Sequence, residues 1–127
     1  MKKLNFAVLA WVLGSSAAWA TDAIPHCYYR GNDLPIDNDR VVNLEKSTPN
    51  QYKTQAHVKG TITELYNDHT GHKHFAIELE NTAGAGIEVI YNEVFGALPE
   101  LKVGMTVETC GEYITSSAPT AQYPASP

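Results

Sequence analysis

A strict alternation of side chains over residues 52–63 constrains the fold of this chain more than any other feature. The register from Lys53 to Thr63 is wholly polar, whereas the other register holds apolar or small residues: Tyr52, Thr54, Ala56, Val58, Gly60 and Ile62. A period of two marks a long strand with one buried face. Because Leu65 falls in the polar register, we predict a bulge between Gly60 and Glu64 that lets the strand bend.

Three further segments show the same period and are separated by turn residues. Alternation predicts strands at 74–80, 87–92 and 105–114, with turns at Asn67–Gly71 and Asn81–Gly86. The segment Glu93–Leu101 lacks the alternation, and we expect a short helix there. This order is typical of the OB-fold. We therefore predict a mainly β chain that forms an OB-fold-like five-strand Greek-key barrel, incomplete, with a short helix between strands three and four. Another small antiparallel barrel or sandwich is the alternative.

Only four strands are visible in the sequence, one fewer than this barrel requires. The segment 116–127 does not supply the fifth, because Pro119, Pro124 and Pro127 cannot donate to a strand ladder. Three explanations stay open: the chain is a fragment of a longer protein, the segment near Val41 covers the gap, or another copy pairs with an open edge. A strand-pairing homodimer is therefore one expected partner.

The first 20 residues have the layout of a secretory signal peptide. Two lysines precede an apolar run at Leu4–Leu13, and Ala18-Trp19-Ala20 supplies a small-x-small cleavage site. The apolar run is about half the roughly 20 residues of a membrane-spanning helix. We expect a periplasmic or secreted protein without a membrane span after cleavage; an N-terminal anchor is the alternative. The expected regions are a signal peptide at 1–20, an irregular lead-in at 21–50, an OB-like domain at 51–115 and a disordered tail rich in Pro, Ser and Ala at 116–127.

Export also decides how the two cysteines are interpreted. Cys27 and Cys110 would lie in an oxidising compartment, where two cysteines usually pair. We predict a disulfide between them, with two free thiols as the alternative. The formal net charge of −5 argues against general nucleic-acid binding, because such binding needs cations to displace phosphate counterions.

The densest group of reactive side chains surrounds the turn before the second strand. It contains Asp68, His69, His72 and His74. His72 and His74 are two apart on a strand, so they share a face opposite Phe75, and both imidazoles can reach one zinc or copper ion. We predict His69, His72 and His74 as candidate metal ligands, with a set of solvated histidines as the alternative. No other cofactor is expected.

A second candidate site follows strands two and three and the adjoining loops, where OB barrels bind their ligands. The candidate contacts are His57, Lys59, Lys73, His74, Tyr91 and Asn92. They would suit a small ligand, an oligosaccharide or a protein. The acidic side chains on nearby strands would repel a polyanion; they are Glu78, Glu80, Glu88 and Glu93.

Short motifs between Gln55 and Tyr113, about half of the chain, resemble a family of small exported bacterial domains of unknown function. The motifs are His57-Val58-Lys59-Gly60-Thr61-Ile62, Gly71-His72-Lys73-His74-Phe75, Ile90-Tyr91-Asn92, Leu101-Lys102-Val103-Gly104-Met105-Thr106-Val107 and Gly111-Glu112-Tyr113. The resemblance implies an OB-like fold. The family pattern has Gln where this chain has Lys73, and His where it has Tyr91. It also continues into a His-containing strand that is absent here, so the resemblance implies that this strand is the missing fifth one.

These features favour a non-enzymatic exported binding domain whose ligand is unknown. The alternative is a metal-dependent hydrolase or nuclease-like enzyme that uses the histidines near the turn between the first two strands. Glu64 and Glu112, at the ends of the neighbouring first and fourth strands, are a candidate acid/base pair.

Overall fold

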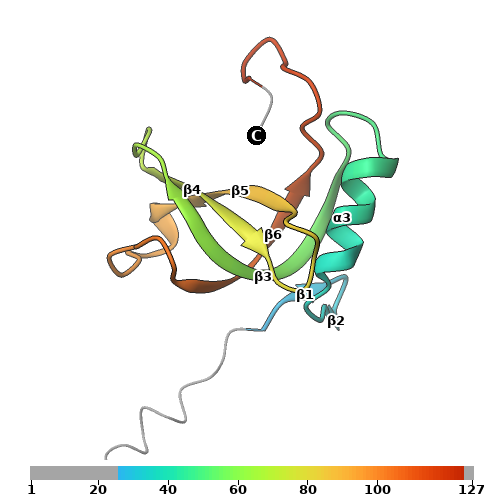
Figure 1. Cartoon of the computed structure of the whole chain (residues 1–127), viewed down its shortest axis with the longest axis horizontal. Coiled ribbons are helices and arrows are strands. Elements are labelled where there is room, and N and C mark those ends of the chain that lie inside the picture. The colour runs from blue at the N-terminus through green and yellow to red at the C-terminus, as the bar shows by residue number, and fades with distance from the viewer. Residues whose placement is uncertain (1–25, 125–127) are drawn as a thin grey trace, which may run out of the picture.

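The structure, a computed structural model, describes residues 26–124, so the predicted signal peptide lies outside the described residues. The chain is mainly β with one α-helix (Figure 1). A short hairpin, β1 (Tyr28–Tyr29) and β2 (Asn32–Asp33), precedes helix α3 (Asn38–Ser47). The main strands are β3 (Lys53–Leu65), β4 (His72–Leu79), β5 (Gly86–Asn92) and β6 (Thr106–Ile114), and a single 3-10 turn, η1 (Glu93–Phe95), follows β5.

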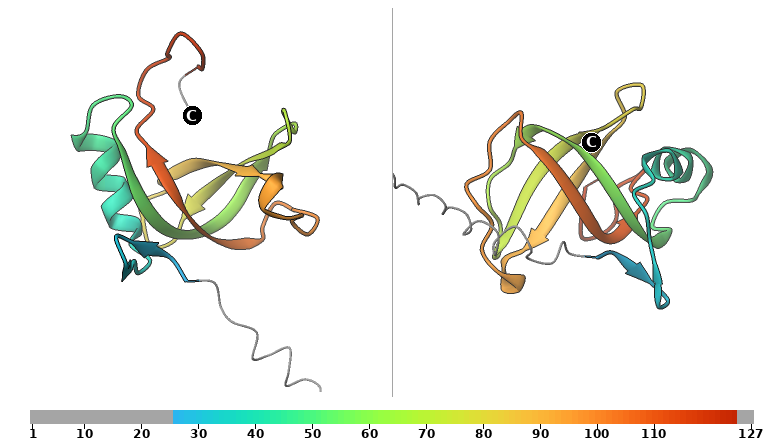
Figure 2. Two further views of the ribbon diagram at one scale, coloured as in Figure 1. Left: turned by 180° about the vertical axis from the view of Figure 1, so that it is seen from behind. Right: turned by 90° about the horizontal axis from the view of Figure 1, so that it is seen from below.

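The four long strands form one antiparallel sheet in the order β5-β4-β3-β6. The sheet curls into a half-barrel with β5 and β6 as its edges (Figures 1 and 2). The four strands predicted from alternation are confirmed. The register between β3 and β4 shifts between Ile62 and Glu64, which confirms the predicted bulge and returns Leu65 to the face of its partner Phe75.

Gly60 stands where β3 is paired on both sides. It lies opposite Leu79 of β4 and Val107 of β6. A Cβ at this position would overlap the backbone carbonyl oxygen of Glu78 and lie 3.3 Å from Cδ1 of Ile77. Only glycine therefore lets β3 approach β4 this closely at the bend.

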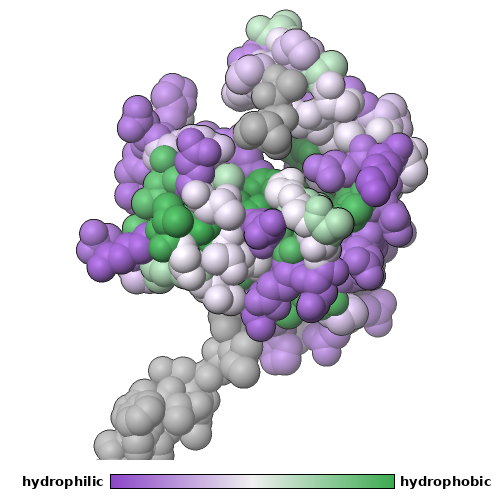
Figure 3. Space-filling view, viewed as in Figure 1, coloured by the Kyte–Doolittle hydropathy of each residue, from purple (hydrophilic) through white to green (hydrophobic). Residues whose placement is uncertain are grey.

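The core lies between the inner face of the sheet and α3. Its buried side chains come from the helix and the two central strands: Val41, Ala56, Val58, Ile62, Phe75, Ile77 and Leu79. The inner-facing side chains of the edge strands are only partly buried; they include Ile87, Val89, Val107 and Tyr113. Burial therefore falls from the centre of the sheet towards its two edges. Figure 3 shows hydrophobic residues gathered on the face seen in Figure 1, with hydrophilic residues around them.

Residues 38–47 form a helix within the segment that we expected to be irregular. The carboxylate of Asp37 accepts a hydrogen bond from the Arg40 amide and so caps the first turn. Val41 is 1% exposed and anchors the helix in the core. The helix is thus held by one cap and one deeply buried side chain.

The start of α3 also covers a stretch of β3 that lies beyond the end of β4. The Asp37 amide donates to the carbonyl of His57 at 2.9 Å, and Arg40 donates to the carbonyl of Gln55 at 2.9 Å. The Asn38 amide group donates to the carbonyls of Lys59 (2.8 Å) and Glu80 (2.9 Å). The lead-in therefore covers an edge of β3. The outer edges of β5 and β6, by contrast, have no strand partner within residues 26–124.

The two remaining connections also differ from expectation. The predicted helix between strands three and four is reduced to η1, which ends at Gly96 (φ 127°), and Pro99 follows. The described part of the tail, residues 116–124, forms neither helix nor strand. Its beginning is anchored, because the amides of Ser117 and Ala118 donate to Oδ1 of Asn50 at 2.9 and 3.1 Å.

The predicted disulfide between Cys27 and Cys110 is present, with the two Cα atoms 5.6 Å apart. It ties the segment before β1 to the middle of β6. Within residues 26–124, no helix has the length and apolar character needed to cross a bilayer.

Candidate functional site

A tight turn brings two of the predicted histidines face to face. Thr70 (φ 50°) and Gly71 (φ 75°) both have positive φ, the pattern of a two-residue type I′ hairpin turn. The amide and carbonyl of His69 exchange hydrogen bonds of 3.0 Å with those of His72. Paired residues of a hairpin point to the same face, so the turn sets the two imidazoles side by side.

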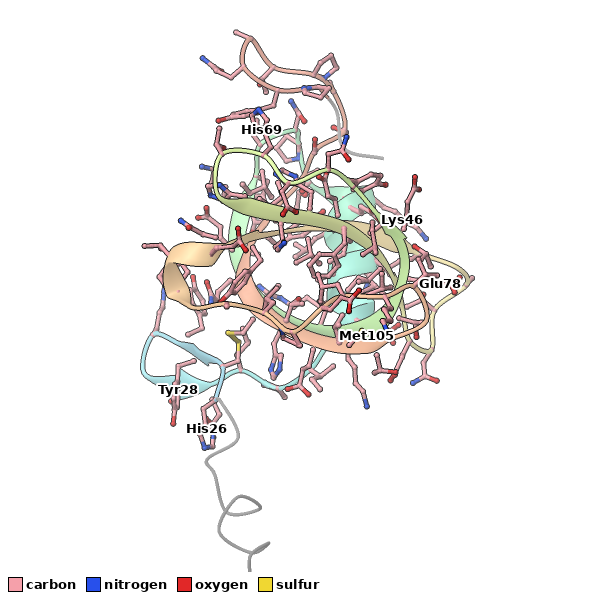
Figure 4. The ribbon with its side chains drawn as sticks, turned by 90° about the vertical axis from the view of Figure 1, so that its left-hand side faces the viewer. His26, Tyr28, Lys46, His69, Glu78 and Met105 are labelled. Carbon is pink, nitrogen blue, oxygen red and sulfur yellow. A yellow bond between two sulfur atoms is a disulfide. The ribbon has the colours of Figure 1, made fainter. Side chains whose placement is uncertain are left out.

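His74 joins this pair because residues two apart on a strand share a face. The ring centroid of His74 lies 6.4 Å from that of His69 and 6.5 Å from that of His72. We call His69, His72 and His74 the histidine cluster. In Figure 4, His69 lies at one end of the molecule and His26 at the opposite end. The structure therefore brings the three predicted metal ligands together.

Two ring nitrogens of the cluster are held by oxygen acceptors. Nδ1 of His72 donates to the carbonyl of Thr70 at 2.9 Å, and Nδ1 of His74 donates to Oε2 of Glu88 at 3.0 Å. The side chains of His74 and Glu88 are 21% and 20% exposed, so this pair is shielded from water on most sides. In a neutral imidazole, a protonated Nδ1 leaves the lone pair on Nε2.

Acidic and phenolic groups adjoin the cluster. Burial raises the pKa of the Tyr66 phenol, and the nearby carboxylates of Glu64 and Glu88 raise it further. Tyr66 also lines a shallow depression of about 290 Å³, together with Thr63, Ala76, Ile77, Glu78, Gly84, Gly86 and Ile87. This volume is at the lower limit of small-molecule pockets. None of the three histidines lines this depression.

Within residues 26–124, no three His, Cys, Asp or Glu side chains stand close enough to hold a metal ion as they are placed. The histidine cluster comes near to this condition, because its rings lie close together and, within residues 26–124, His72 and His74 make their hydrogen bonds through Nδ1, not through Nε2.

The six predicted ligand contacts do not form one surface. Lys73 pairs with Tyr91 in the register of the inner face, whereas His74 pairs with Ile90 in the outer register. His57 and Lys59 lie on the part of β3 that pairs with β6. His74 lies near the other end of β3, because its carbonyl accepts a hydrogen bond from the amide of Tyr66, the residue that follows β3. The contacts are therefore divided between two faces and two ends of the sheet.

The positive groups among these contacts are already paired with carboxylates. Lys73 lies 2.6 Å from Asp68 and 3.7 Å from Glu93, and the hydrogen bond to Asp68 is the main reason that its pKa is raised. Lys59 lies 3.7 Å from Glu80. This pairing leaves little cationic surface for a phosphate group.

His57, Tyr91 and Asn92 make structural hydrogen bonds. His57 bonds the Leu34 carbonyl at 2.6 Å and the Glu108 carboxylate at 2.8 Å. The Tyr91 hydroxyl donates to the carbonyl of Gly96, and the Asn92 side chain caps η1. Each of these side chains therefore holds a connection in place.

Glu64 and Glu112 do not form a pair. Glu112 lies opposite Gln55, near the start of β3, whereas Glu64 lies near its end. Because β3 and β6 are antiparallel, nine residues of β3, roughly 30 Å of extended chain, separate the two positions. The expectation of an acid/base pair at adjoining strand ends is wrong.

Sequence reasoning missed Glu88 as a partner of the histidine cluster. The register of β4 and β5 places Glu88 opposite Ala76, two residues from His74 on the same face. The predicted turn at residues 81–86 does not give this pairing, because counting outwards from it pairs Glu80 with Ile87, whereas the structure closes the hairpin over residues 80–84. The partner of His74 therefore depends on a hairpin register that local alternation does not give.

Comparisons with protein-family models, with curated proteins and with solved structures found no match for this chain.

Proposed function

We propose that the chain is an exported OB-like binding domain that holds an extended segment of another protein between β5 and β6. One observation carries the proposal. Within residues 26–124, β5 and β6 each pair with a strand on one side only, so each offers a row of backbone N–H and C=O groups. An extended peptide satisfies such groups by adding a strand to the sheet.

The strand order supports the OB-like interpretation. Four antiparallel strands in the order β5-β4-β3-β6, with η1 in the connection from β5 to β6, match an OB barrel that lacks its last strand. In that barrel the last strand lies between the strands equivalent to β5 and β6. The bulge and Gly60 supply the bend that the first strand of such a barrel needs.

The inner surface beside these edges is apolar enough to receive alternate side chains of an added strand. The partly buried residues Val89 and Tyr113 belong to different edges and both pack against the core. Val94 and Phe95, in the connection between the edges, are 78% and 81% exposed. Covering such side chains would contribute about 25 cal/mol for each Å² removed from water.

The charge of the chain favours a protein segment with basic residues over a polyanion. Glu112 is exposed on the outer register of β6, next to the free edge. A Lys or Arg on an added strand would face this carboxylate as a cross-strand pair. The formal net charge of −5 and the paired lysines oppose phosphate-rich ligands.

Export is supported by the Cys27–Cys110 disulfide, because such bonds persist in oxidising compartments. The predicted signal peptide agrees with it. A periplasmic or secreted location remains part of the proposal and is tested by the N-terminal residue of protein recovered from cells.

The binding proposal is tested with a short labelled peptide of alternating Val and Lys. We expect saturable binding by fluorescence anisotropy. Val107→Lys places a charge on the inner face of β6 and should weaken binding at least about tenfold, the equivalent of about 1.4 kcal/mol. Val89→Lys should do the same from the opposite edge.

Thr106→Lys is the matched control, because Thr106 is the exposed neighbour of Val107 in the outer register. Circular dichroism confirms that each variant is folded. Equal affinity of the three variants and the parent would overturn the proposal. A concentration-dependent dimer in sedimentation, abolished by Val107→Lys, would instead identify a second copy of the chain as the occupant.

A further inference from the structure

We infer that the histidine cluster binds one late first-row transition ion, Zn²⁺ or Cu²⁺, through Nε2 of His69, His72 and His74, with Glu88 orienting His74. This site lies on the outer face of the sheet, near the turn between β3 and β4, whereas the proposed function uses the free backbone edges and the inner face of β5 and β6. It therefore goes beyond that function and can fail or succeed independently.

The ring orientations support metal binding. The Thr70 carbonyl can only accept a hydrogen bond, so Nδ1 of His72 carries the proton, and the Glu88 carboxylate fixes His74 in the same tautomer. Both rings then present the Nε2 lone pair. Metal-binding histidines commonly donate their other ring nitrogen to a carboxylate or backbone carbonyl in this way.

The rings need only a small rearrangement to meet at one ion. With metal–nitrogen distances of about 2.0–2.1 Å, two imidazoles on a tetrahedral ion have ring centroids roughly 5 Å apart. The observed centroid separations are 6.4 and 6.5 Å. Closing this difference needs about 1 Å of movement, and exposed His69 at the turn has room for it.

The neighbouring charges favour a cation. Glu64 of β3 and Glu88 of β5 both lie opposite Ala76, one on each side of β4, and Oε2 of Glu88 is 3.0 Å from Nδ1 of His74. The ammonium group of Lys73, which lies between His72 and His74 in the sequence, belongs to the opposite register and is paired with Asp68 and Glu93. A cation approaching the cluster therefore meets carboxylates and no unpaired positive side chain of this hairpin.

The ligand set selects the class of ion. Three imidazole nitrogens suit zinc, copper or nickel, whereas Mg²⁺ and Ca²⁺ prefer oxygen ligands. Three protein ligands also leave one tetrahedral position for water or an exogenous ligand. We assign no reaction to this position.

The test is calorimetric titration of the disulfide-bonded protein with ZnCl₂, followed by the electron paramagnetic resonance spectrum of Cu²⁺ added to the same protein. We expect one saturable site and nitrogen hyperfine structure from the imidazoles. Glu88→Gln should weaken Zn²⁺ binding roughly 10–100-fold, the usual effect of losing an orienting partner. His72→Ala and His74→Ala remove ligands and should weaken it by more than this.

His26→Ala is the matched control, because His26 is exposed and lies at the far end of the molecule (Figure 4). It should leave the affinity unchanged. Circular dichroism reports whether the variants are folded, independently of metal and of the proposed peptide binding. Absence of saturable binding by the parent, or equal affinities of His72→Ala, His74→Ala and His26→Ala, would overturn the inference.

Discussion

Two glycines of the sheet occupy opposite environments, and this contrast yields a prediction about single residues. A Cβ on Gly60 would overlap the Glu78 carbonyl oxygen, whereas a Cβ on Gly111 would have no atom within 4 Å. Gly60→Ala should therefore lower the free energy of unfolding by about 1–3 kcal/mol, the usual cost of overpacking. Denaturant titration followed by circular dichroism measures the change.

Gly111→Ala is the internal comparison, and it should stay within about 0.5 kcal/mol of the parent. If both substitutions cost the same, the close approach of β3 to β4 at Gly60 would not be what makes glycine necessary there.

Single residues also show which features of the fold could be predicted from the sequence and which could not. Gly60 and Leu65 predicted the bend and the bulge, because a glycine and a slipped register both interrupt a period of two. Asn38 and Glu88 carry no such signal. Asn38 bonds backbone atoms of Lys59 and Glu80, which are 21 and 42 residues away, and only the folded chain brings them together.

At the level of elements, the strands were predictable and the helix was not. The strands alternate strictly because one face of the sheet is buried. Helix α3 buries only Val41 fully, and its sequence is rich in Asn, Asp and charged residues that are common in turns. Its stability comes from tertiary contacts with β3, which no local pattern records.

In the candidate site, too, local spacing predicted one part and failed for another. A spacing of two placed His72 and His74 on one face, and the turn placed His69 beside them. The division of the six ligand contacts between two faces follows from the alternation itself, because Lys73 and His74 are consecutive residues of β4 and therefore point to opposite faces. Alternation within a strand predicts the face of the sheet on which each side chain lies. It does not predict which ends of different strands lie next to each other.

The disulfide joins the lead-in to the last strand, so its removal should loosen one end of the molecule and lower overall stability. It links residues 83 apart in sequence, and closing a long loop restricts the unfolded chain. We expect reduction with dithiothreitol to lower the free energy of unfolding by about 2–4 kcal/mol.

The double variant Cys27→Ala, Cys110→Ala should resemble the reduced protein and be insensitive to dithiothreitol. A parent protein that unfolds at the same denaturant concentration with and without reductant would contradict this expectation.

For the whole molecule, three groups predict a loss of stability at alkaline pH. Burial raises the pKa of Tyr113, burial and two carboxylates raise that of Tyr66, and the hydrogen bond to Asp68 raises that of Lys73. In each case the folded chain holds its proton more tightly than the unfolded chain. Stability should therefore be full below about pH 10 and fall as the pH rises through the raised pKa values.

Urea unfolding at a series of pH values between about 8 and 11 measures this slope. The double variant Tyr66→Phe, Tyr113→Phe should flatten it, whereas Tyr123→Phe, at an exposed position, should leave it unchanged. A parent slope that is flat or rises with pH would contradict the prediction.

The position of the two cysteines has a consequence for biosynthesis. Cys27 precedes β1 and Cys110 lies in β6, so the bond encloses α3 and three of the four long strands. Synthesis delivers Cys27 early and its partner only when the final strand has been made. The cross-link can therefore form only after nearly all of the sheet has been synthesised. A nascent chain arrested before residue 110 carries one reactive thiol, which marks it for capture by oxidoreductases through mixed disulfides.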